Sequence, residues 1–372
     1  MGTPWQTPRK VKRCATGLLF LTLAVFLSAA AAHAPHAVER VYSRGAYPIV
    51  LSALSCVSGV VPLSVAEVLL LVVAFLLGRR LLEMARQGRA MGWLPALGRC
   101  LADLVLAAGG LSLAFVLLWG LNYRRLPFAA SAGLDASPSS AEELRDLATA
   151  LAGRANEMRV GLAEDGQGVM MAKGGARSVL ERTNAGFDQA AALYPTLGGS
   201  CGRPKALLVS EALSWLGLTG IYSPFTGEAN VNVRAPDCEL PFSASHETAH
   251  QRGFAREDEA NFAGYLACRF HPDRDFNYAG ALAASIHAAN ALFAADRAAG
   301  QAVGATRSPA VRRDLAALRA WAARHEGPAA RTSERVNDAY LRVQGQAEGV
   351  RSYGRMVDLL LAERRAERCR GK

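Results

Sequence analysis

The chain has 372 residues, enough for two or three domains, and a formal net charge of +10 at pH 7. Much of the positive charge lies in loops beside apolar segments and in the C-terminal AERRAERCRGK, and no basic stripe is interleaved with aromatic residues. This distribution argues against nucleic acid as a partner. Hydrophobic residues make up 51% of the chain and are concentrated in its first third, which points to a membrane region.

Three apolar segments close to membrane-spanning length lie at 15–32, 61–78 and 101–121. About 20 apolar residues cross the hydrocarbon core of a bilayer as a helix. We therefore predict a three-helix membrane region over residues 1–125, with the lipid bilayer as a partner. Buried core helices are the alternative for all three segments. A cleaved signal peptide is the alternative for the first, because a basic stretch precedes it and small residues follow it.

The placement of arginine predicts the orientation of these helices. The N-terminus and the loop between the second and third segments are basic, whereas the loop between the first two segments carries only Arg40 and Arg44. The positive-inside rule places the basic regions in the cytoplasm and everything after about residue 122 on the opposite side. Arg124 and Arg125, which follow the third segment directly, argue in the other direction.

The remainder of the chain divides into a Ser/Pro/Ala-rich linker over 126–139 and a domain over 140–372. Ser140 and Glu143 have capping-box spacing and predict a helix to about residue 159. A second helix is expected over 176–193, a short strand over 204–210, and a loop or hairpin over 217–233 that ends in a strand. From residue 242 the pattern is helical almost throughout. The predicted fold is mainly α, with a small β element before the helix that carries the motif below.

The stretch SASHETAHQRGFAREDEANFAGYL, residues 243–266, contains an HExxH motif. His246 and His250 are four residues apart and so lie on one helix face, where both imidazoles can bind the same ion. Zinc lowers the pKa of a bound water to about 7, and Glu247 can take that proton as general base. Ser243 or Ser245 can cap the start of this helix.

A catalytic zinc usually has a third protein ligand, which must come from elsewhere. Gly253 allows the chain to turn and return, and the segment that returns offers Glu257 or Glu259. We favour Glu257, because Asn261 is four residues later on the same helix face and can hydrogen-bond a ligand histidine. A solvated acidic helix start is the alternative explanation for these carboxylates.

HETAHQRGFAREDEANFAGYLAC resembles the bacterial membrane-protein family catalogued as domain of unknown function 3810, which carries HExxHQ-x-GF followed by EDEANF. GIYSPFTGEANVN and VNDAYLRVQGQAEGVRSYGRMVDLLL also resemble segments of that family. The resemblance implies three N-terminal spans, a zincin-like helical domain and a bacterial inner membrane. The ExxxN element is also similar to zinc peptidases of the glutamate-ligand class, which by analogy implies Glu257 as a zinc ligand.

Several other residues have candidate roles. Val231–Val233 could form the edge strand on which zincins bind an extended substrate, or part of a structural hairpin. Tyr340, Arg351 or Tyr353 could stabilise an oxyanion, although residues of these types are more often used in packing or on the surface. Cys201 could pair with Cys238 outside the cytoplasm, with buried thiols as the alternative. His271 and His287 are expected to have no role in the site.

These features predict a membrane-anchored zinc metallopeptidase, a hydrolase that acts on a peptide or protein substrate. Its domain would lie on the extracytoplasmic side of a bacterial inner membrane. His246, His250 and Glu257 would hold zinc, Glu247 would act as base, and Asn261 would support a ligand. The alternative is a non-catalytic membrane assembly or sensor protein with a structural or regulatory metal site, which would not need Glu247.

Overall fold

The computed structural model describes residues 6–199 and 202–370. The chain forms two compact units, and the first comprises residues up to Val50, Val65–Arg125 and Pro224–Thr226. The second comprises Leu51–Ser64, Leu126–Ser223 and the chain from Gly227 onward. The structure is mainly α, with one small sheet among the described residues, as the sequence predicts.

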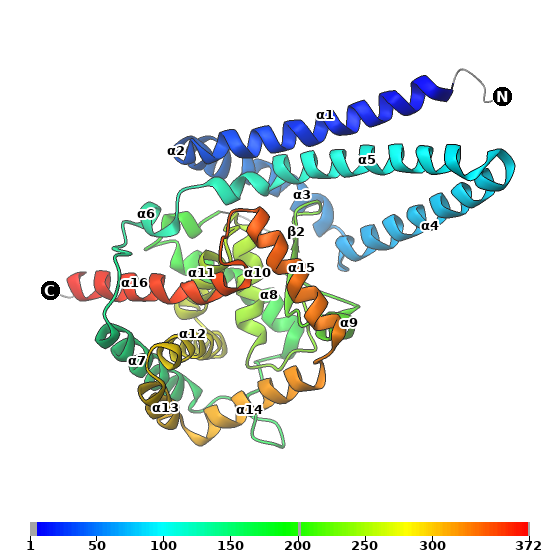
Figure 1. Ribbon diagram of the computed structural model, residues 1–372. Coiled ribbons are helices and arrows are strands. Elements are labelled where there is room, and N and C mark those ends of the chain that lie inside the picture. The colour runs from blue at the N-terminus through cyan, green and yellow to red at the C-terminus, as the bar shows by residue number, and fades with distance from the viewer. Residues whose placement is uncertain (1–5, 200–201, 371–372) are drawn as a thin grey trace. The chain divides into compact units, whose positions relative to one another are not determined.

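The first unit contains three long helices, α1 (Gln6–Ala32), α4 (Val65–Met91) and α5 (Trp93–Leu118) (Figure 1). Between α1 and α4 the chain forms the short α2 (Pro35–Ala37), a π-helical stretch (Val38–Ala46) and α3 (Tyr47–Gly59). A 3-10 turn (Gly120–Arg124) follows α5. The buried guanidinium of Arg125 binds both carboxylate oxygens of Glu39, at 2.8 and 2.9 Å. Its charge is therefore compensated, which weakens its value as a signal of orientation.

Helices α1 and α5 run parallel and pack closely. Lys10 donates to the carbonyl of Pro95 near one end, and Arg124 donates to Ser28 near the other. Midway, a Cβ added to Gly109 would lie 2.2 Å from the carbonyl oxygen of Gly17, so the two backbones are in contact. Small residues at such a crossing are typical of helix pairs in membranes.

Three described helices are long and apolar enough to cross a membrane: Lys10–Ala32, Trp93–Leu118 and Arg274–Ala295. The first two confirm the segments predicted at 15–32 and 101–121 as membrane-length apolar helices, and both are mostly exposed to the surroundings. The third is largely buried inside the second unit and is a core helix. The predicted segment at 61–78 falls on α4, which is not among the three because Glu67, Arg79 and Arg80 bound its apolar run.

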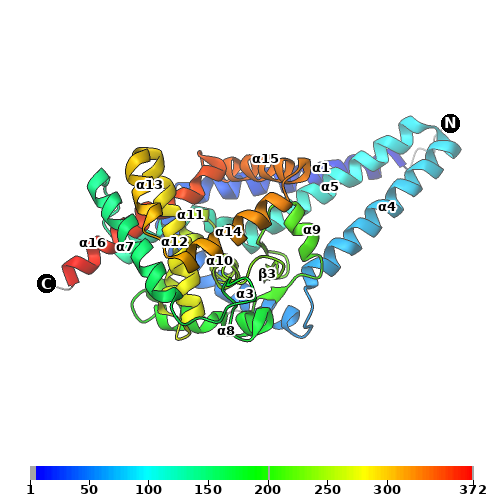
Figure 2. The same ribbon diagram turned by 90° about the horizontal axis from the view of Figure 1, so that it is seen from below.

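The second unit is a helical domain whose elements are arranged around α10, α11 and α12 (Figures 1 and 2). Its helices are α6 (Phe128–Ala132), α7 (Ala141–Arg159), α8 (Gly175–Ala190), α9 (Ser210–Trp215), α10 (Leu240–Gln251), α11 (Glu257–Phe270), α12 (Arg274–Ala295), α13 (Arg297–Ala305), α14 (Pro309–Arg324), α15 (Pro328–Val343) and α16 (Met356–Arg370). Short 3-10 turns lie at Pro195–Leu197 and Gly349–Arg355. Ser140 and Glu143 form the predicted capping box at the start of α7. The segment expected as a linker contains α6, whose Phe128 is buried in the core.

The small sheet has the strand order β1-β3-β2, formed by Lys205–Ala206, Glu228–Val231 and Gly220–Ser223. β1 pairs with β3 in parallel and β2 pairs with it antiparallel, so β3 is the central strand. Of the two alternatives for Val231–Val233, the free edge strand is therefore wrong and the structural hairpin is confirmed at Val231, which pairs with β2; β2 is an edge strand instead. The strand expected over 204–210 is only two residues long, and the chain then turns into α9.

Close approach of the backbones fixes α11 against its neighbours. A Cβ on Gly264 would lie 3.1 Å from the backbone nitrogen of His246, so α11 packs directly on the motif helix α10. A Cβ on Gly186 of α8 would lie 2.1 Å from the carbonyl oxygen of Ala267. Neither position has room for a larger side chain. These contacts determine where α11 places its first turn relative to α10.

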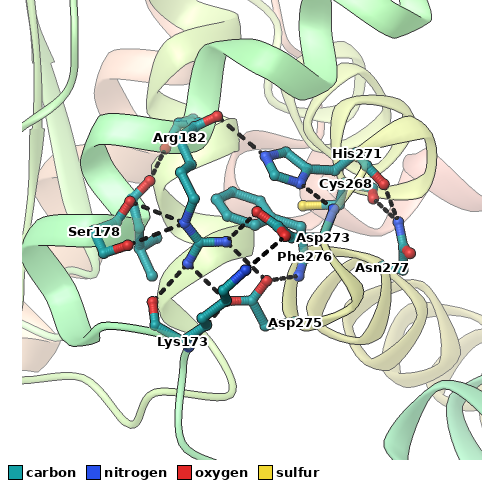
Figure 3. A network of polar contacts seen from close by, with 11 residues as sticks. Lys173, Ser178, Arg182, Cys268, His271, Asp273, Asp275, Phe276 and Asn277 are labelled. Atoms are coloured by element: carbon teal, nitrogen blue, oxygen red, sulfur yellow. Dashed lines mark hydrogen bonds and ion pairs between the residues drawn. The ribbon is translucent and has the colours of Figure 1, made fainter.

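A polar network ties α8 to the junction between α11 and α12 (Figure 3). Arg182 binds Asp273 at 2.8 Å and both carboxylate oxygens of Asp275, at 2.8 and 3.1 Å. His271 accepts a hydrogen bond from the backbone N–H of Asp273 on its Nδ1 and stacks on Phe276. Since Nδ1 is the acceptor, Nε2 carries the proton and donates to the carbonyl of Arg182. His271 is thus a structural residue, in agreement with its expected lack of a site role.

Candidate metal centre

The motif helix α10 ends in a turn that positions one of its histidines. Gly253 has a φ of +85°. Its N–H donates to the backbone carbonyl of His250, and the N–H of Phe254 donates to the backbone carbonyl of Ala249. This pair of hydrogen bonds is a Schellman motif, in which glycine adopts the left-handed conformation at little cost. The carbonyl of Phe254 then lies 2.8 Å from Nδ1 of His250. That contact fixes the proton on Nδ1 and leaves the lone pair of Nε2 available.

Ser243 and Ser245, the expected caps, lie inside this helix rather than at its start. α10 begins at Leu240, with Pro241 in its first turn. The hydroxyl of Ser245 donates to the carbonyl of Pro241 one turn earlier. Proline suits this position because its missing N–H would have no intrahelical partner. The helix therefore starts earlier than the serine signal indicates.

His246, His250 and Glu257 converge on one point. Each offers one ligand atom, and the three atoms lie within 4.8 Å of one another. Oε2 of Glu257 is 3.4 Å from Nε2 of His246 and 3.4 Å from Nε2 of His250. Bonds of about 2.0–2.1 Å at the tetrahedral angle would separate two ligand atoms by about 3.3–3.4 Å. The two distances from Glu257 to the histidines therefore match those that a tetrahedral ion requires, and the third pair of donors lies within 4.8 Å.

The three groups interact strongly through their charges. Burial alone would raise the pKa of Glu257, but the adjacent imidazoles outweigh it and lower that pKa well below its usual range. Burial acts to lower the pKa of His250, yet the charge of Glu257 raises it to about 9. An anionic carboxylate thus lies between two imidazoles in a site that is nearly closed to solvent. Such a concentration of donors is well suited to a divalent cation.

Glu259 points away from this group. Its Oε1 accepts hydrogen bonds from the backbone N–H of Phe128 and from Arg256, both at 2.8 Å. Asn261 is buried on α11, one turn after Glu257. Nδ1 of His250 contacts the carbonyl of Phe254, and Nδ1 of His246 has no hydrogen-bond partner among the described residues. Support of a ligand by Asn261 therefore stays a prediction.

Glu247 lies next to the three donors without belonging to them. Its side chain is buried, and Oε2 has no hydrogen-bond partner among the described residues. Burial raises the pKa of Glu247, the charge of Glu257 adds to this, and the two histidines oppose it. Strand β2 presses against this side chain, since a Cβ on Gly220 would lie 2.5 Å from Cγ of Glu247. Only glycine leaves room for the carboxylate there.

A cleft of about 510 Å³ opens onto His246 and Glu247. One wall is the segment 216–220, which leads into β2, and the other is the start of α15 with the turn before it. Polar side chains from α15 line the second wall, among them Arg331, Ser333 and Asn337. The cleft is large enough for a few residues of an extended chain beside the edge strand.

Two of the candidate oxyanion residues, Tyr340 and Arg351, are not among the described residues that line this cleft. Tyr340 lies on α15 and Arg351 in the 3-10 turn that follows it, but neither contributes to the walls, and the side chain of Tyr353 lies outside the described residues. Arg331 and Asn337 do line it, and no local sequence signal distinguishes them. His287, expected to be uninvolved, is close enough to His246 for the charge of His246 to act with burial in lowering its pKa to about 4.

Cys201, the expected disulfide partner, lies outside the described residues. Cys238 is buried, and burial raises the pKa of its thiol far above the usual range.

Comparison with known proteins places this site in a wider context. Residues 42–361 match the family model described as a protein of unknown function, DUF3810. The chain belongs to this family. No curated protein matches the chain, and no solved structure does. The region matched to DUF3810 includes the helices α3 to α5, the sheet and all three metal-donor residues.

Proposed function

We propose that this protein is a membrane-anchored zinc metallopeptidase. The observation that carries the proposal is the position of Glu257 Oε2, 3.4 Å from Nε2 of both His246 and His250, beside a buried carboxylate, Glu247, that is not one of the three donors. Two imidazoles and one carboxylate are a common donor set of catalytic zinc sites. Zinc bound there would lower the pKa of a water molecule and polarise a substrate carbonyl.

The chain's own residues supply the remaining requirements of amide hydrolysis. Glu247 has a raised proton affinity, which suits it to take a proton from the attacking water and to deliver it to the leaving amine. The cleft beside it admits a polypeptide, and β2 offers the hydrogen-bonding groups of an edge strand to an extended substrate. Arg331 and Asn337 in the opposite wall carry hydrogen-bond donors for the substrate backbone.

The arrangement supports a zincin-like peptidase of the glutamate-ligand class. In that class both histidines come from one helix and the glutamate from the next, as α10 and α11 provide here. Glu247 also separates this proposal from the alternative of a structural or regulatory metal site. A structural site has no use for a buried carboxylate beside its ligands, because burying it costs free energy without a compensating contact.

We infer that α4 is a third span and that the second unit lies on the extracytoplasmic side of a bacterial inner membrane. Two parallel helices that both cross a bilayer need one crossing between them, and α4 is the long helix available between α1 and α5. Both of the segments that enter the second unit, Leu51–Ser64 and the chain after Arg125, then emerge on the same side. The arginine-rich loop at 79–99 lies on the other side, which fits the cytoplasm.

Metal analysis of the full-length protein in detergent tests the proposal. We expect about one zinc per chain in the wild type and in Glu247→Gln, and none in His246→Ala. Hydrolysis of a peptide library should be lost in both variants. A folded wild-type protein that binds no zinc would refute the metal site. Unchanged hydrolysis in Glu247→Gln would refute the role of Glu247 and favour a non-catalytic site with a contaminating peptidase.

A further inference from the structure

Lys205 fastens the turn between α3 and α4 to the sheet of the second unit. Its Nζ donates to the carbonyl oxygens of Ser58, Val61 and Leu63 at 2.7, 2.8 and 2.9 Å. It also pairs with Glu228 at 2.6 Å, and the two side chains are 11% and 2% exposed. Lys205 belongs to β1 and Glu228 to β3. One ammonium group thus joins two strands to the end of α3.

A second contact joins α3 to the motif helix. The carbonyl oxygen of Gly227 accepts a hydrogen bond from Nε2 of Gln251 at 2.7 Å and from the hydroxyl of Ser55 at 3.3 Å. Gln251 is adjacent to His250 in α10, and Ser55 lies in α3. A Cβ on Gly227 would lie 2.8 Å from Cβ of Leu54, so the two backbones are close. The end of α3 is therefore held as firmly to α10 as to the sheet.

Apolar side chains are exposed around this attachment. They come from the end of α3, from the following turn and from the segment after β1, and we call them the membrane-contact face: Val57, Val60, Val61, Leu63, Leu208 and Val209. Val60 and Leu208 are 81% and 72% exposed. Lys205 binds the turn after α3 and precedes Leu208 by three residues. The apolar side chains of the turn and those of the segment after β1 are therefore neighbours. Several large apolar side chains exposed together mark an interaction surface.

We propose that the membrane-contact face rests on the lipid bilayer. Ser64, at its end, is followed directly by α4, whose apolar residues between Val68 and Leu77 are exposed on successive positions and so on all sides of the helix. A helix that is apolar all round is surrounded by lipid or buried in protein. The membrane-contact face thus includes the last residues of the chain before α4. Its valine and leucine side chains leave water and lie at the boundary between the lipid headgroups and the acyl chains.

The three carbonyls bound by Lys205 support lipid rather than water as the neighbour. The carbonyls of Val61 and Leu63 lie in the turn after α3, and that of Ser58, in the last turn of α3, also accepts from the N–H of Val61. In water the solvent satisfies carbonyl groups at such a helix end. At a lipid surface the protein must provide the donor itself. Lys205 provides it, with Glu228 compensating its charge. A dry interface with a second copy of the chain would need the same donor, so it is the direct continuity of this face with α4 that favours lipid.

The contact places the candidate metal centre close to the membrane. Neighbouring strands are about 4.8 Å apart, so β2 can be no more than about 10 Å farther from the bilayer than β1. Gly220 of β2 contacts Glu247, so the cleft lies at about the same distance from the bilayer as β2. This consequence rests on the proposed function and deepens it: the substrate is a polypeptide held at the membrane surface, cleaved next to its lipid or helical anchor.

Depth measurement on the full-length protein in phospholipid vesicles tests the contact without any need for activity. Cys56 is exposed beside Val57 and serves as a native labelling position once Cys14, Cys201 and Cys369 are replaced by serine. A fluorophore on Cys56 should lose most of its emission to nitroxide lipids and little to a water-soluble quencher. A control label in the variant Gln301→Cys lies on α13, at the far end of the same unit from α3, and should show the opposite pattern (Figures 1 and 2). Equal behaviour of the two labels would overturn the proposal.

A second measurement tests the substrate class. The same peptide library is offered to the vesicles free in solution and attached to a lipid, at equal total concentration, with Glu247→Gln as the inactive control. Faster cleavage of the attached peptides, at positions near the lipid, supports the proposal. Equal cleavage of both forms overturns the substrate class while leaving the peptidase intact. Cleavage of neither form, with Cys56 still quenched by lipid, counts against the peptidase and leaves the membrane contact standing.

Discussion

Gly220→Ala tests whether strand β2 positions the proposed base. The new Cβ would lie 2.5 Å from Cγ and 2.6 Å from Oε1 of Glu247. Because apolar atoms are at their optimum at about 3.5–4.0 Å, one of the two partners must move by about 1 Å. The φ of Gly220 is not in the left-handed region, so alanine adds a methyl group without adding backbone strain. We expect the Glu247 side chain to rotate, since the backbone of α10 is held by β3 and α11.

The size of the effect follows from that displacement. A catalytic group misplaced by about 1 Å costs about 100-fold in rate. Overpacking of this kind also costs about 1–3 kcal/mol of the free energy of unfolding. In a domain of this size 1 kcal/mol lowers the Tm by about 2–4 °C, so the Tm should fall by about 2–12 °C. The metal donors are not displaced, and zinc content should stay at the wild-type value.

Three measurements on one preparation separate these effects: hydrolysis of lipid-attached peptides, zinc content and the Tm. Gly153→Ala is the matched control, because Gly153 lies in α7 and a Cβ there would meet nothing within 4 Å. Removing a helical glycine should raise stability by about 0.5–1 kcal/mol and leave hydrolysis unchanged. Wild-type hydrolysis in a folded, zinc-loaded Gly220→Ala protein would refute the positioning role of β2. Loss of zinc would instead show that Gly220 supports the ligands.

Three further predictions concern other parts of the second unit. Lys205→Met should lower stability by about 3–5 kcal/mol, because it leaves Glu228 buried without its cation. The double variant with Glu228→Leu should recover only part of that loss in thermal unfolding, because the carbonyls of Ser58, Val61 and Leu63 stay without the donor that Lys205 provided; equal losses in the two variants would contradict a charge effect. Glu257→Gln should abolish zinc binding in metal analysis, whereas Glu259→Gln should keep it; the reverse result would exchange their roles. Burial holds the pKa of His271 below its ordinary value of 6.5; the hydrogen bond to the Arg182 carbonyl and the nearby aspartates oppose it, and the charge of Arg182 adds to it. The unfolded chain therefore takes up the proton more readily, so stability is complete above pH 6.5 and falls as the pH drops below it. His271→Asn should flatten that decline between pH 8 and 5, and an unchanged slope would exclude His271 as its source.

The sequence predicts those parts of the site that depend on local geometry. The spacing of His246 and His250 specifies a shared helix face, and Gly253 specifies a turn, so both could be predicted from periodicity and residue type. Glu257 could be preferred over Glu259 only by its relation to Asn261, and the structure brings Glu257 to the histidines by packing α11 on α10 through Gly264. That packing depends on a contact between helices and has no counterpart in a local pattern.

Non-local pairing accounts for what the sequence analysis missed. β-forming residues at 217–233 predict strands but not their order, and the order decides that β2, not the segment at Val231, is the edge beside the cleft. Lys205 reads as an ordinary residue of a short strand, although it binds a turn more than 140 positions earlier in the chain. The apolar run after it predicts a longer strand because exposure to lipid and burial in a sheet favour the same residue types.

The residues that follow HExxH show how the local and non-local parts of the site are joined. His246, Glu247 and His250 carry the proposed chemistry, whereas Gln251 and Phe254 carry none. Gln251 donates a hydrogen bond to the Gly227 carbonyl, which also accepts one from the hydroxyl of Ser55 in α3. The carbonyl of Phe254 contacts Nδ1 of His250. The end of α10 and the turn after it thus orient His250 on one side and, through the Gly227 carbonyl, link the helix to the end of α3 on the other. If the membrane-contact face rests on lipid, the same turn sets both the geometry of the zinc site and its distance from the bilayer.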